Sequence, residues 1–309
     1  MQALDLEQTY APVRAAQSKR ATEKIAAMRT LFPESNSHLF AKADLTSSDA
    51  ALVDHLFYRA LDLAKANRTS ELEQLGAALC DVKEAGQGSG GLRNVSHKDC
   101  IYVADSAFQS PIYLYDFARK DVEQSPAWLD SARDYLVRTD FNDFVTQAMG
   151  LLIELDPKND EEHSESYTIT ALHASIFMDS HSMAVRNAET LVHEATHNWL
   201  NYLFDYYEEP LPKTPRWLSP WRGVERPVAG MVHAFAAFSF VVLFLRAARQ
   251  RIDLPDNEAA YAVAQENEQV FRLGAMQDDF DSILSHIRAP IIADVVSQAY
   301  RAALNQGEG

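Results

Sequence analysis

The pentapeptide His193-Glu194-Ala195-Thr196-His197 lies in a segment, 184–204, whose apolar residues recur at helical spacing. Residues four positions apart lie on the same face of an α-helix, so the imidazoles of His193 and His197 can approach one another. The apolar band that predicts a largely buried helix consists of Ala188, Leu191, Val192, Ala195, Leu200 and Leu203. The chain must therefore fold around a helix that carries two histidines and a glutamate into its interior.

These three polar side chains need partners, because an unpaired polar group costs several kcal/mol inside a protein. One interpretation is a pair of core histidines that are hydrogen-bonded to the backbone. The other is a metal site, for which two histidines four residues apart on a helix are a known ligand pair. We favour the metal site, with Glu194 placed where a carboxylate takes a proton from a metal-bound ligand.

The composition excludes several classes of partner. The net charge of −16 argues against nucleic acid and anionic membranes, which require clustered Lys and Arg. Cys80 and Cys100 form no disulfide framework and no metal-binding spacing. The first ten residues lack the features of a signal peptide, and the longest apolar run, 231–245, is too short to span a membrane. We therefore expect a soluble, cytoplasmic protein.

The N-terminal third is predicted to be helical, in segments 13–31, 48–66 and 70–85. The last of these begins with Ser70-Glu71-Leu72-Glu73, which is typical of a capping box. The run 86–91, Gly-Gln-Gly-Ser-Gly-Gly, fits G-x-G-x-x-G formally but follows a helix and not a strand, so a dinucleotide site is excluded. We expect one domain, 1–309, with a possible helical subdomain 1–91 joined by the glycine-rich loop 86–91.

The remaining sequence predicts more helices and a minor strand component. Helices are expected at 125–137, 141–155, 184–204, 227–251, 257–286 and 290–304, and short strands at 100–104, 166–172 and 174–178. A connection rich in proline and tryptophan, 205–224, follows the motif helix. The expected fold class is mainly α, with a small β element next to the helix of the H-E-x-x-H motif and a metal site between two helices.

A metal site of this kind needs a third protein ligand. The extended motif with Gly and His at fixed spacing is absent, because Leu200 and Leu203 stand at those positions, so a metzincin is excluded. The two leading candidates are His233, which lies in the next helix beside Gly230 and Ala234, and Glu225, which precedes that helix. Spacing alone does not separate them.

Two arginines, Arg222 and Arg226, accompany these candidates. A zinc peptidase has limited use for guanidiniums close to its metal. An iron oxygenase that uses 2-oxoglutarate needs one, since the distal carboxylate of this cosubstrate requires a bidentate arginine partner. The alternative is that both arginines form surface ion pairs with Glu208, Glu209 or Glu225.

The motif His193-Glu194-x-x-His197, followed by Trp221-Arg222-x-x-x-Arg226-Pro227-x-x-Gly230-x-x-His233 and Phe235, resembles the HExxH-type peptide-modification family. Members of this family are linked to ribosomally made peptide natural products, and some are 2-oxoglutarate-dependent peptide β-hydroxylases. The resemblance covers mainly 171–245, about a quarter of the chain. Ala234 departs from the pattern, which has Gly after the third histidine.

The resemblance implies that His193, His197 and His233 bind Fe(II) and that Arg226 or Arg222 anchors 2-oxoglutarate. It also implies a precursor peptide and O2 as substrates, and a role for Glu194 in orienting a ligand or water. The β-carbon of a peptide side chain would then be hydroxylated.

Two other hypotheses stay open at the level of sequence. In a zinc hydrolase, Glu194 would act as the general base and Glu225 as the third ligand. In a binding or scaffold protein, a closed structural metal site would add His173 or His181. Imidazole suits both iron and zinc, so the ligand type alone does not distinguish them.

Overall fold

The structure, a computed structural model, describes residues 6–32, 45–80, 92–103, 110–118, 126–157 and 165–305. Helices make up 65% of it, so the mainly helical class is confirmed. The chain divides into two compact units. Unit 1 contains 1–13, 126–145 and 181–309, and unit 2 contains 14–125 and 146–180.

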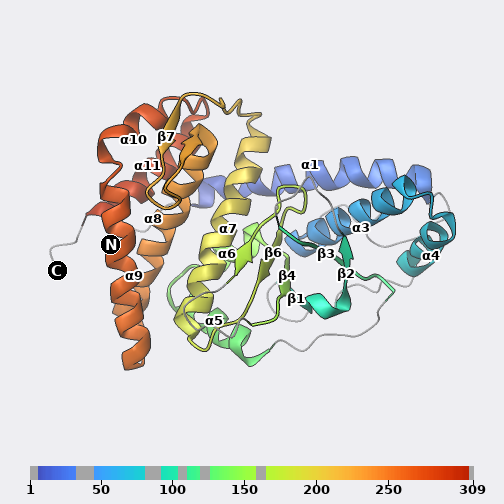
Figure 1. Cartoon of the computed structure of the whole chain (residues 1–309), viewed down its shortest axis with the longest axis horizontal. Coiled ribbons are helices and arrows are strands. Elements are labelled where there is room, and N and C mark those ends of the chain that lie inside the picture. Colours follow the sequence, from blue (N-terminus) through green and yellow to red (C-terminus); the bar gives the residue numbers. More distant parts are fainter. Residues whose placement is uncertain are drawn as a thin grey trace. The chain divides into compact units, whose positions relative to one another are not determined.

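Unit 1 is helical, and its central pair is α7 (Ala184–Tyr206) and α8 (Val228–Arg251), which pack against each other (Figure 1). The other helices that contribute to it are α5 (Ala127–Arg138), α9 (Asp256–Gly274), α10 (Gln277–Leu284) and α11 (Pro290–Leu304). Helix α8 is apolar on every side and long enough to cross a membrane, but 83% of its most apolar window is buried inside the protein. Helix α8 is therefore buried in the way that a core helix is buried.

Aromatic rings join the two central helices. Trp199 of α7 and Phe240 of α8 have ring centroids 5.6 Å apart, and Phe144 of the short helix α6 (Asn142–Ala148) stacks on Phe240 at 4.9 Å. The indole N–H of Trp199 donates to Thr9 Oγ1 at 3.0 Å, so its polar group is satisfied. The rings fix one relative position of α7 and α8, which is a requirement for any site shared by the two helices.

Helix α7 is also held at its start by a carboxylate from another helix. Glu258 of α9 accepts hydrogen bonds from the backbone N–H groups of Ala184 at 3.0 Å and Val185 at 3.2 Å. These N–H groups have no partner within the helix, and a negative charge at a helix N-terminus is favourable. No residue at the start of α7 provides a side-chain cap itself, so α9 supplies it.

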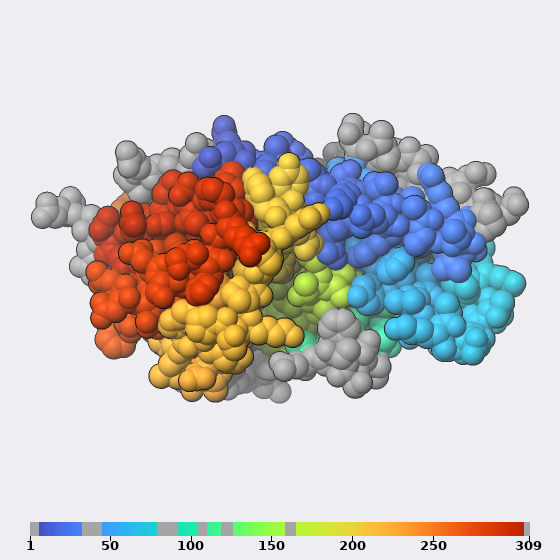
Figure 2. Space-filling view, turned by 90° about the horizontal axis from the view of Figure 1, so that it is seen from above, coloured from blue at the N-terminus to red at the C-terminus, as the bar shows by residue number. Residues whose placement is uncertain are grey.

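The connection after α7 forms a β-hairpin and not an irregular loop. Strand β7 (Arg216–Leu218) pairs antiparallel with β8 (Glu225–Pro227), in the gold and orange part of Figure 1. In Figure 2 the gold segment lies beside the red C-terminal helices. The contacts that hold it there include Trp217 against His286, and the Glu209 carboxylate, which accepts from the backbone N–H groups of Arg288 and Ala289.

Unit 2 contains a four-stranded sheet of order β1-β4-β6-β5. Strands β1 (Arg93–Ser96), β4 (Leu151–Glu154) and β6 (Ser175–Met178) are parallel, and β5 (Ser166–Tyr167) pairs antiparallel with β6. Short strands thus occur within both segments where they were expected, 166–172 and 174–178, but the first is limited to Ser166–Tyr167. A short 3-10 helix, η1 (His97–Asp99), follows β1, and β2 (Cys100–Val103) pairs with β3 (Ile112–Tyr115) as a hairpin.

Helices α3 (Ser47–Lys65) and α4 (Thr69–Cys80) complete unit 2 together with most of α1 (Glu7–Leu31). Their buried cluster contains Ala21, Ile25, Met28, Phe32, Leu52, Val53, Leu56, Ala60, Leu63, Leu75 and Phe117. Helix α4 begins at Thr69, one residue earlier than expected, so Ser70 lies inside its first turn and not at the cap.

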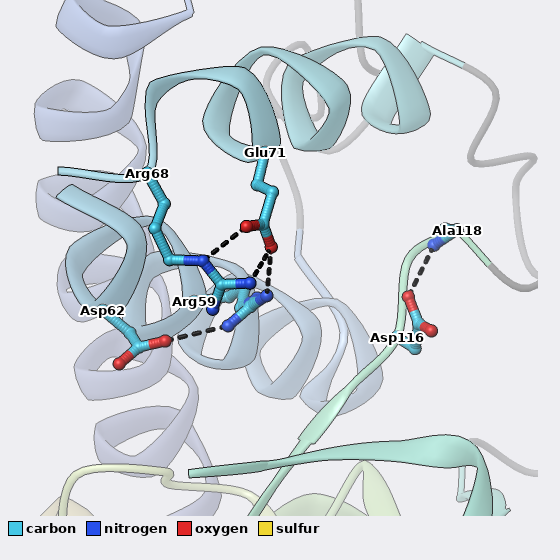
Figure 3. A network of polar contacts seen from close by, with 6 residues as sticks. All are labelled: Arg59, Asp62, Arg68, Glu71, Asp116 and Ala118. Atoms are coloured by element: carbon cyan, nitrogen blue, oxygen red, sulfur yellow. Dashed lines mark hydrogen bonds and ion pairs between the residues drawn. The ribbon is translucent and has the colours of Figure 1, made fainter. Parts of the chain in front are cut away.

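An ion-pair network crosses the turn between these two helices (Figure 3). Arg59 contacts Asp62 at 2.8 Å and Glu71 at 3.5 Å, and Arg68 also pairs with Glu71. Single pairs near a protein surface contribute little each, about 0.2–1 kcal/mol, but Arg59 and Arg68 share the Glu71 carboxylate, which joins the start of α4 to α3.

Two of the predicted helices were wrong in their extent. The predicted helix 141–155 is a helix only to Ala148, and Leu151–Glu154 is the central strand β4. Gly150 lies between the helix and the strand. A Cβ at this position would lie 2.1 Å from the backbone of Ser47, so only glycine fits there. The predicted helix 257–286 is interrupted at Ala275-Met276, between α9 and α10. The glycine-rich segment 86–91 lies outside the described residues.

Candidate metal and anion site

The structure brings together the three histidines that the sequence singled out. The Nε2 atoms of His193 and His197, one turn apart on α7, are separated by 3.1 Å. His233 of α8 lies beside them, with its Nδ1 atom 3.1 Å from the Nδ1 atom of His197. All three rings keep some exposed surface, so they can be reached from solvent.

The spacing of the first pair fits one metal ion. Two imidazole nitrogens bonded to the same ion at about 2.1 Å lie about 3 Å apart. His233, however, faces the opposite nitrogen of the His197 ring, so the three rings form a row and do not converge on one point. Accordingly, no group of three or more His, Cys, Asp or Glu side chains in the described ranges is arranged to hold a metal ion. Coordination by all three requires the His197 or His233 ring to turn.

The three histidines are neutral at pH 7. Burial lowers the pKa of His193 to about 4, and the Arg222 guanidinium contributes. Burial also lowers the pKa of His233 to about 4, with Arg226 as the next cause, and holds the pKa of His197 well below its usual value. A neutral imidazole is the form that binds a metal ion.

Arg222 and Arg226 lie near the histidines. The positive charge of each guanidinium disfavours protonation of the neighbouring imidazoles and so contributes to their low pKa values. Neither arginine forms an ion pair with any carboxylate in the described part of the chain. Burial followed by the charge of Arg222 lowers the pKa of Arg226. Two cations thus lie close together beside neutral rings, which is an arrangement suited to an anion.

Gly230 makes room for Arg226. A Cβ at Gly230 would lie 2.7 Å from Nε, 3.0 Å from Cζ and 3.1 Å from Nη2 of Arg226. The arginine side chain therefore lies across the first turn of α8, one turn before His233. The absence of a side chain at position 230 therefore makes space for this arginine.

The β-hairpin explains why Arg226 and Glu225 differ in position. Successive side chains of a strand point to opposite faces. Arg226 and its cross-strand partner Trp217 occupy the face toward α8 and His286, whereas Glu225 lies on the other face and is exposed. Of the two candidates for a third ligand, His233 is therefore the one that lies next to His197. Glu225 lies on the face of the hairpin opposite to Arg226.

Aromatic rings border the row of histidines. Phe238 lies 5.0 Å from His193, and Phe204 lies 5.6 Å from His233. Trp221 stacks on Phe238 at 4.7 Å with the rings nearly parallel, and its N–H donates to Gln269 at 2.9 Å. Sequence reasoning gave none of these rings a role, although Trp221 and Phe238 were visible beside the arginines and His233.

The other residues considered from the sequence take distinct places. Glu194 is buried on α7, with 3% of its surface exposed. Glu209 caps the start of α11 as described above and does not pair with the arginines. His181 accepts a hydrogen bond from the N–H of Met183 at 3.0 Å in the turn before α7, and His173 is a buried residue of unit 2.

A scan against protein-family models and a search of curated proteins found no match for this chain.

Proposed function

We propose that this protein is a cytoplasmic, non-haem Fe(II)- and 2-oxoglutarate-dependent oxygenase that hydroxylates the β-carbon of a side chain in a peptide, as members of the resembled family do. One observation carries the proposal: three adjacent neutral histidines lie beside two guanidiniums that have no carboxylate partner among the described residues. A metal bound by imidazole alone leaves the site positive, and the arginines add to this charge, so the site favours an anionic cosubstrate.

The residues present fit the cofactor in two respects. The Nε2 atoms of His193 and His197 have the spacing of two ligands on one ion, and His233 is the nearest further imidazole. Arg226, held across Gly230, presents a planar guanidinium of the kind that binds a carboxylate through two parallel hydrogen bonds. When bound, Fe(II) with 2-oxoglutarate supplies a two-electron oxidation in which O2 gives one oxygen atom to a C–H bond and one to succinate, with loss of CO2.

The side chains of this protein perform the positioning. Phe204 and Phe238 form an apolar wall beside the histidines, and the stack of Trp221 on Phe238 restrains that wall. Glu194 lies next to His193 in the buried part of α7 and is the carboxylate nearest in sequence to the proposed ligands. We assign to it the orientation of a ligand or of water.

The test is anaerobic reconstitution with Fe(II) and 2-oxoglutarate, followed by visible absorption. A weak charge-transfer band is expected when the keto acid binds to the metal. We expect the band to vanish in His233→Ala and to weaken strongly in Arg226→Ala. Glu225→Ala is the matched control and should retain it.

A different pattern would overturn the proposal. If wild-type protein gives no band, binds Zn²⁺ tightly and loses that metal in Glu225→Ala, the site is that of a zinc hydrolase with Glu194 as the base. Mass spectrometry of a precursor peptide would then show cleavage and not a gain of one oxygen atom.

A further inference from the structure

The hairpin β7–β8 has two chemically different faces. Trp217 and Arg226 form the face toward α8, and the opposite face carries Arg216, Leu218 and Glu225. All three of these are exposed, and Leu218 has 63% of its surface accessible. Val224, which follows the turn at the tip, is 57% exposed. By the same alternation Val224 lies on the face of Trp217 and Arg226, so Leu218 is the apolar side chain of the exposed face.

The backbone of β7 has a free edge. Ser219 N–H donates to Val224 C=O at 3.0 Å, so these opposed residues form a hydrogen-bonded pair. Such pairs alternate along an antiparallel ladder, and the next one is therefore Trp217 with Arg226. The N–H and C=O groups of Arg216 and Leu218 point away from β8 as a consequence.

The opposite edge is less suited to a further strand. Pro227 has no N–H to donate, and the C=O of Glu225 already accepts from the Arg216 side chain. In the described part of the chain, β7 and β8 pair only with each other. An added strand would therefore find its backbone partners on β7.

The charge of this segment is opposite to that of the protein. Within 211–227 there are four basic residues (Lys213, Arg216, Arg222 and Arg226) and one acidic residue, Glu225, which gives a net charge of +3. The whole chain carries −16. A local positive segment on an acidic protein attracts an anionic partner and repels a cationic one.

The hairpin tip also lies close to the row of histidines. Trp221, within the turn 219–224, stacks on Phe238 at 4.7 Å, and Phe238 lies 5.0 Å from His193. A chain that pairs with β7 therefore runs past the turn that contacts the wall of the candidate site.

From these observations we propose that the free edge of β7 binds an extended acidic peptide as an added strand. Main-chain hydrogen bonds to Arg216 and Leu218 hold the peptide, the positive charge of the segment that includes Lys213 and Arg216 attracts its carboxylates, and Leu218 contacts its apolar side chains on the exposed face. Presentation of this peptide to the histidines rests on the proposed function, whereas its binding to β7 does not.

The experiment uses the metal-free protein without 2-oxoglutarate, so that docking is measured apart from oxygenase chemistry. The probe is a fluorescein-labelled ten-residue peptide of alternating Glu and Val, and fluorescence anisotropy reports its binding at low salt. We expect binding that weakens as salt increases. The counterpart of alternating Lys and Val should not bind, and methylation of four central backbone nitrogens should abolish binding.

Two variants test the location. Arg216→Glu should weaken binding about tenfold. Leu218→Pro should weaken it about fivefold, because it removes an outward N–H without removing a ladder bond. Arg301→Glu, an equal charge reversal on α11, should have no effect, and thermal melting checks that each variant is folded.

The proposal is overturned if the methylated peptide binds as well as the unmodified one, or if Arg216→Glu and Arg301→Glu behave alike. Equal binding of a labelled ten-residue oligothymidine would also overturn it, since the hairpin would then recognise negative charge and not an extended peptide. The two proposals can fail separately. If no charge-transfer band appears with Fe(II) and 2-oxoglutarate but the peptide still binds, the oxygenase proposal is wrong and the proposal of peptide binding to β7 stands.

Discussion

His55 in unit 2 and His197 in unit 1 are both histidines kept neutral by burial, yet their partners differ. The Nδ1 atom of His55 accepts the backbone N–H of Tyr115 at 3.1 Å, so its proton is on Nε2, which donates to Ser175 Oγ at 3.0 Å. Both nitrogens of His197 face other histidines. The first ring has fixed hydrogen-bond partners on two other elements, whereas the second contacts two further imidazoles, which under the proposed function are metal ligands.

This difference also decides what His55 does not do. The pair His55–Ser175 resembles a base and a nucleophile, but the Nε2 atom facing the hydroxyl already carries the proton. His55 therefore cannot take a proton from Ser175. Burial lowers the pKa of His55 to about 3. A low histidine pKa therefore indicates a ligand site only when the ring has no fixed hydrogen-bond partners.

The largest expected effect comes from His55→Leu. The change leaves the N–H of Tyr115 and the hydroxyl of Ser175 without this partner in the interior, which should lower the free energy of unfolding by about 3 kcal/mol. Urea denaturation followed by circular dichroism measures it. Affinity for Fe(II) should be unchanged, and a loss of metal binding in this variant would erase the distinction between the two histidines.

His197→Ala should show the reverse pattern. Metal affinity should fall at least about a hundredfold, equivalent to about 2.7 kcal/mol, because this ring lies between the other two. Stability should change by less than about 1 kcal/mol, since the ring is partly exposed and has no main-chain partner. Competition with a coloured chelator under anaerobic conditions gives the affinity. Wild-type metal affinity in this variant would place His197 with His55 as a structural residue.

Gly230→Ala isolates the contribution of Arg226. The new methyl group would occupy the position of the guanidinium, so affinity for 2-oxoglutarate should fall about tenfold, or about 1.4 kcal/mol, while metal affinity is retained. Gly274→Ala is the matched control, because its Cβ would meet only Leu304 at 4.0 Å. Titration of the visible band with 2-oxoglutarate measures both. Equal affinity in the two variants would show that Arg226 does not hold the anion.

The smallest effect concerns Glu189, a titratable group of α7 with one protein partner. Tyr261 donates to its carboxylate at 2.7 Å, but burial dominates and raises the pKa of Glu189 to about 7. A raised pKa means that the folded state holds this proton more tightly than the unfolded state does, so stability is lost as the pH rises from about 4.5 through 7. Glu189→Gln should remove about 1 kcal/mol of this pH dependence, measured by urea denaturation at pH 5 and pH 8. If the free energies of unfolding at pH 5 and pH 8 differ as much in the variant as in the wild type, another group causes the pH dependence.

The sequence predicted α7 and α8 of unit 1 well because their signal is local. Helix α7 begins at the expected residue, and α8 begins one residue later than expected and ends where predicted. The motifs named His233 and Glu225 as the alternatives beside the His193 and His197 pair, and the structure places His233 next to His197. These inferences required only helical periodicity and the rule that the faces of adjacent helices meet.

The parallel sheet of unit 2 could not be predicted in the same way. Leu151–Glu154 is a short apolar run that has no periodicity of its own, and its partners lie far away in sequence at Arg93–Ser96 and Ser175–Met178. The hairpin β7–β8 was hidden by the prolines around it. Gly150 and Gly223 were the available signals, the first for a close backbone approach and the second for a turn with φ of +64°.

Under the proposed function, the position of Arg226 across Gly230 links the binding of the metal ion to the binding of 2-oxoglutarate. An anion held by this guanidinium reduces the positive potential at His233, which lies one turn further along α8. The cation and the anion then each increase the affinity of the protein for the other, by the same factor in both directions. A cell that is low in 2-oxoglutarate would, by this reciprocity, also leave the protein poorer in metal.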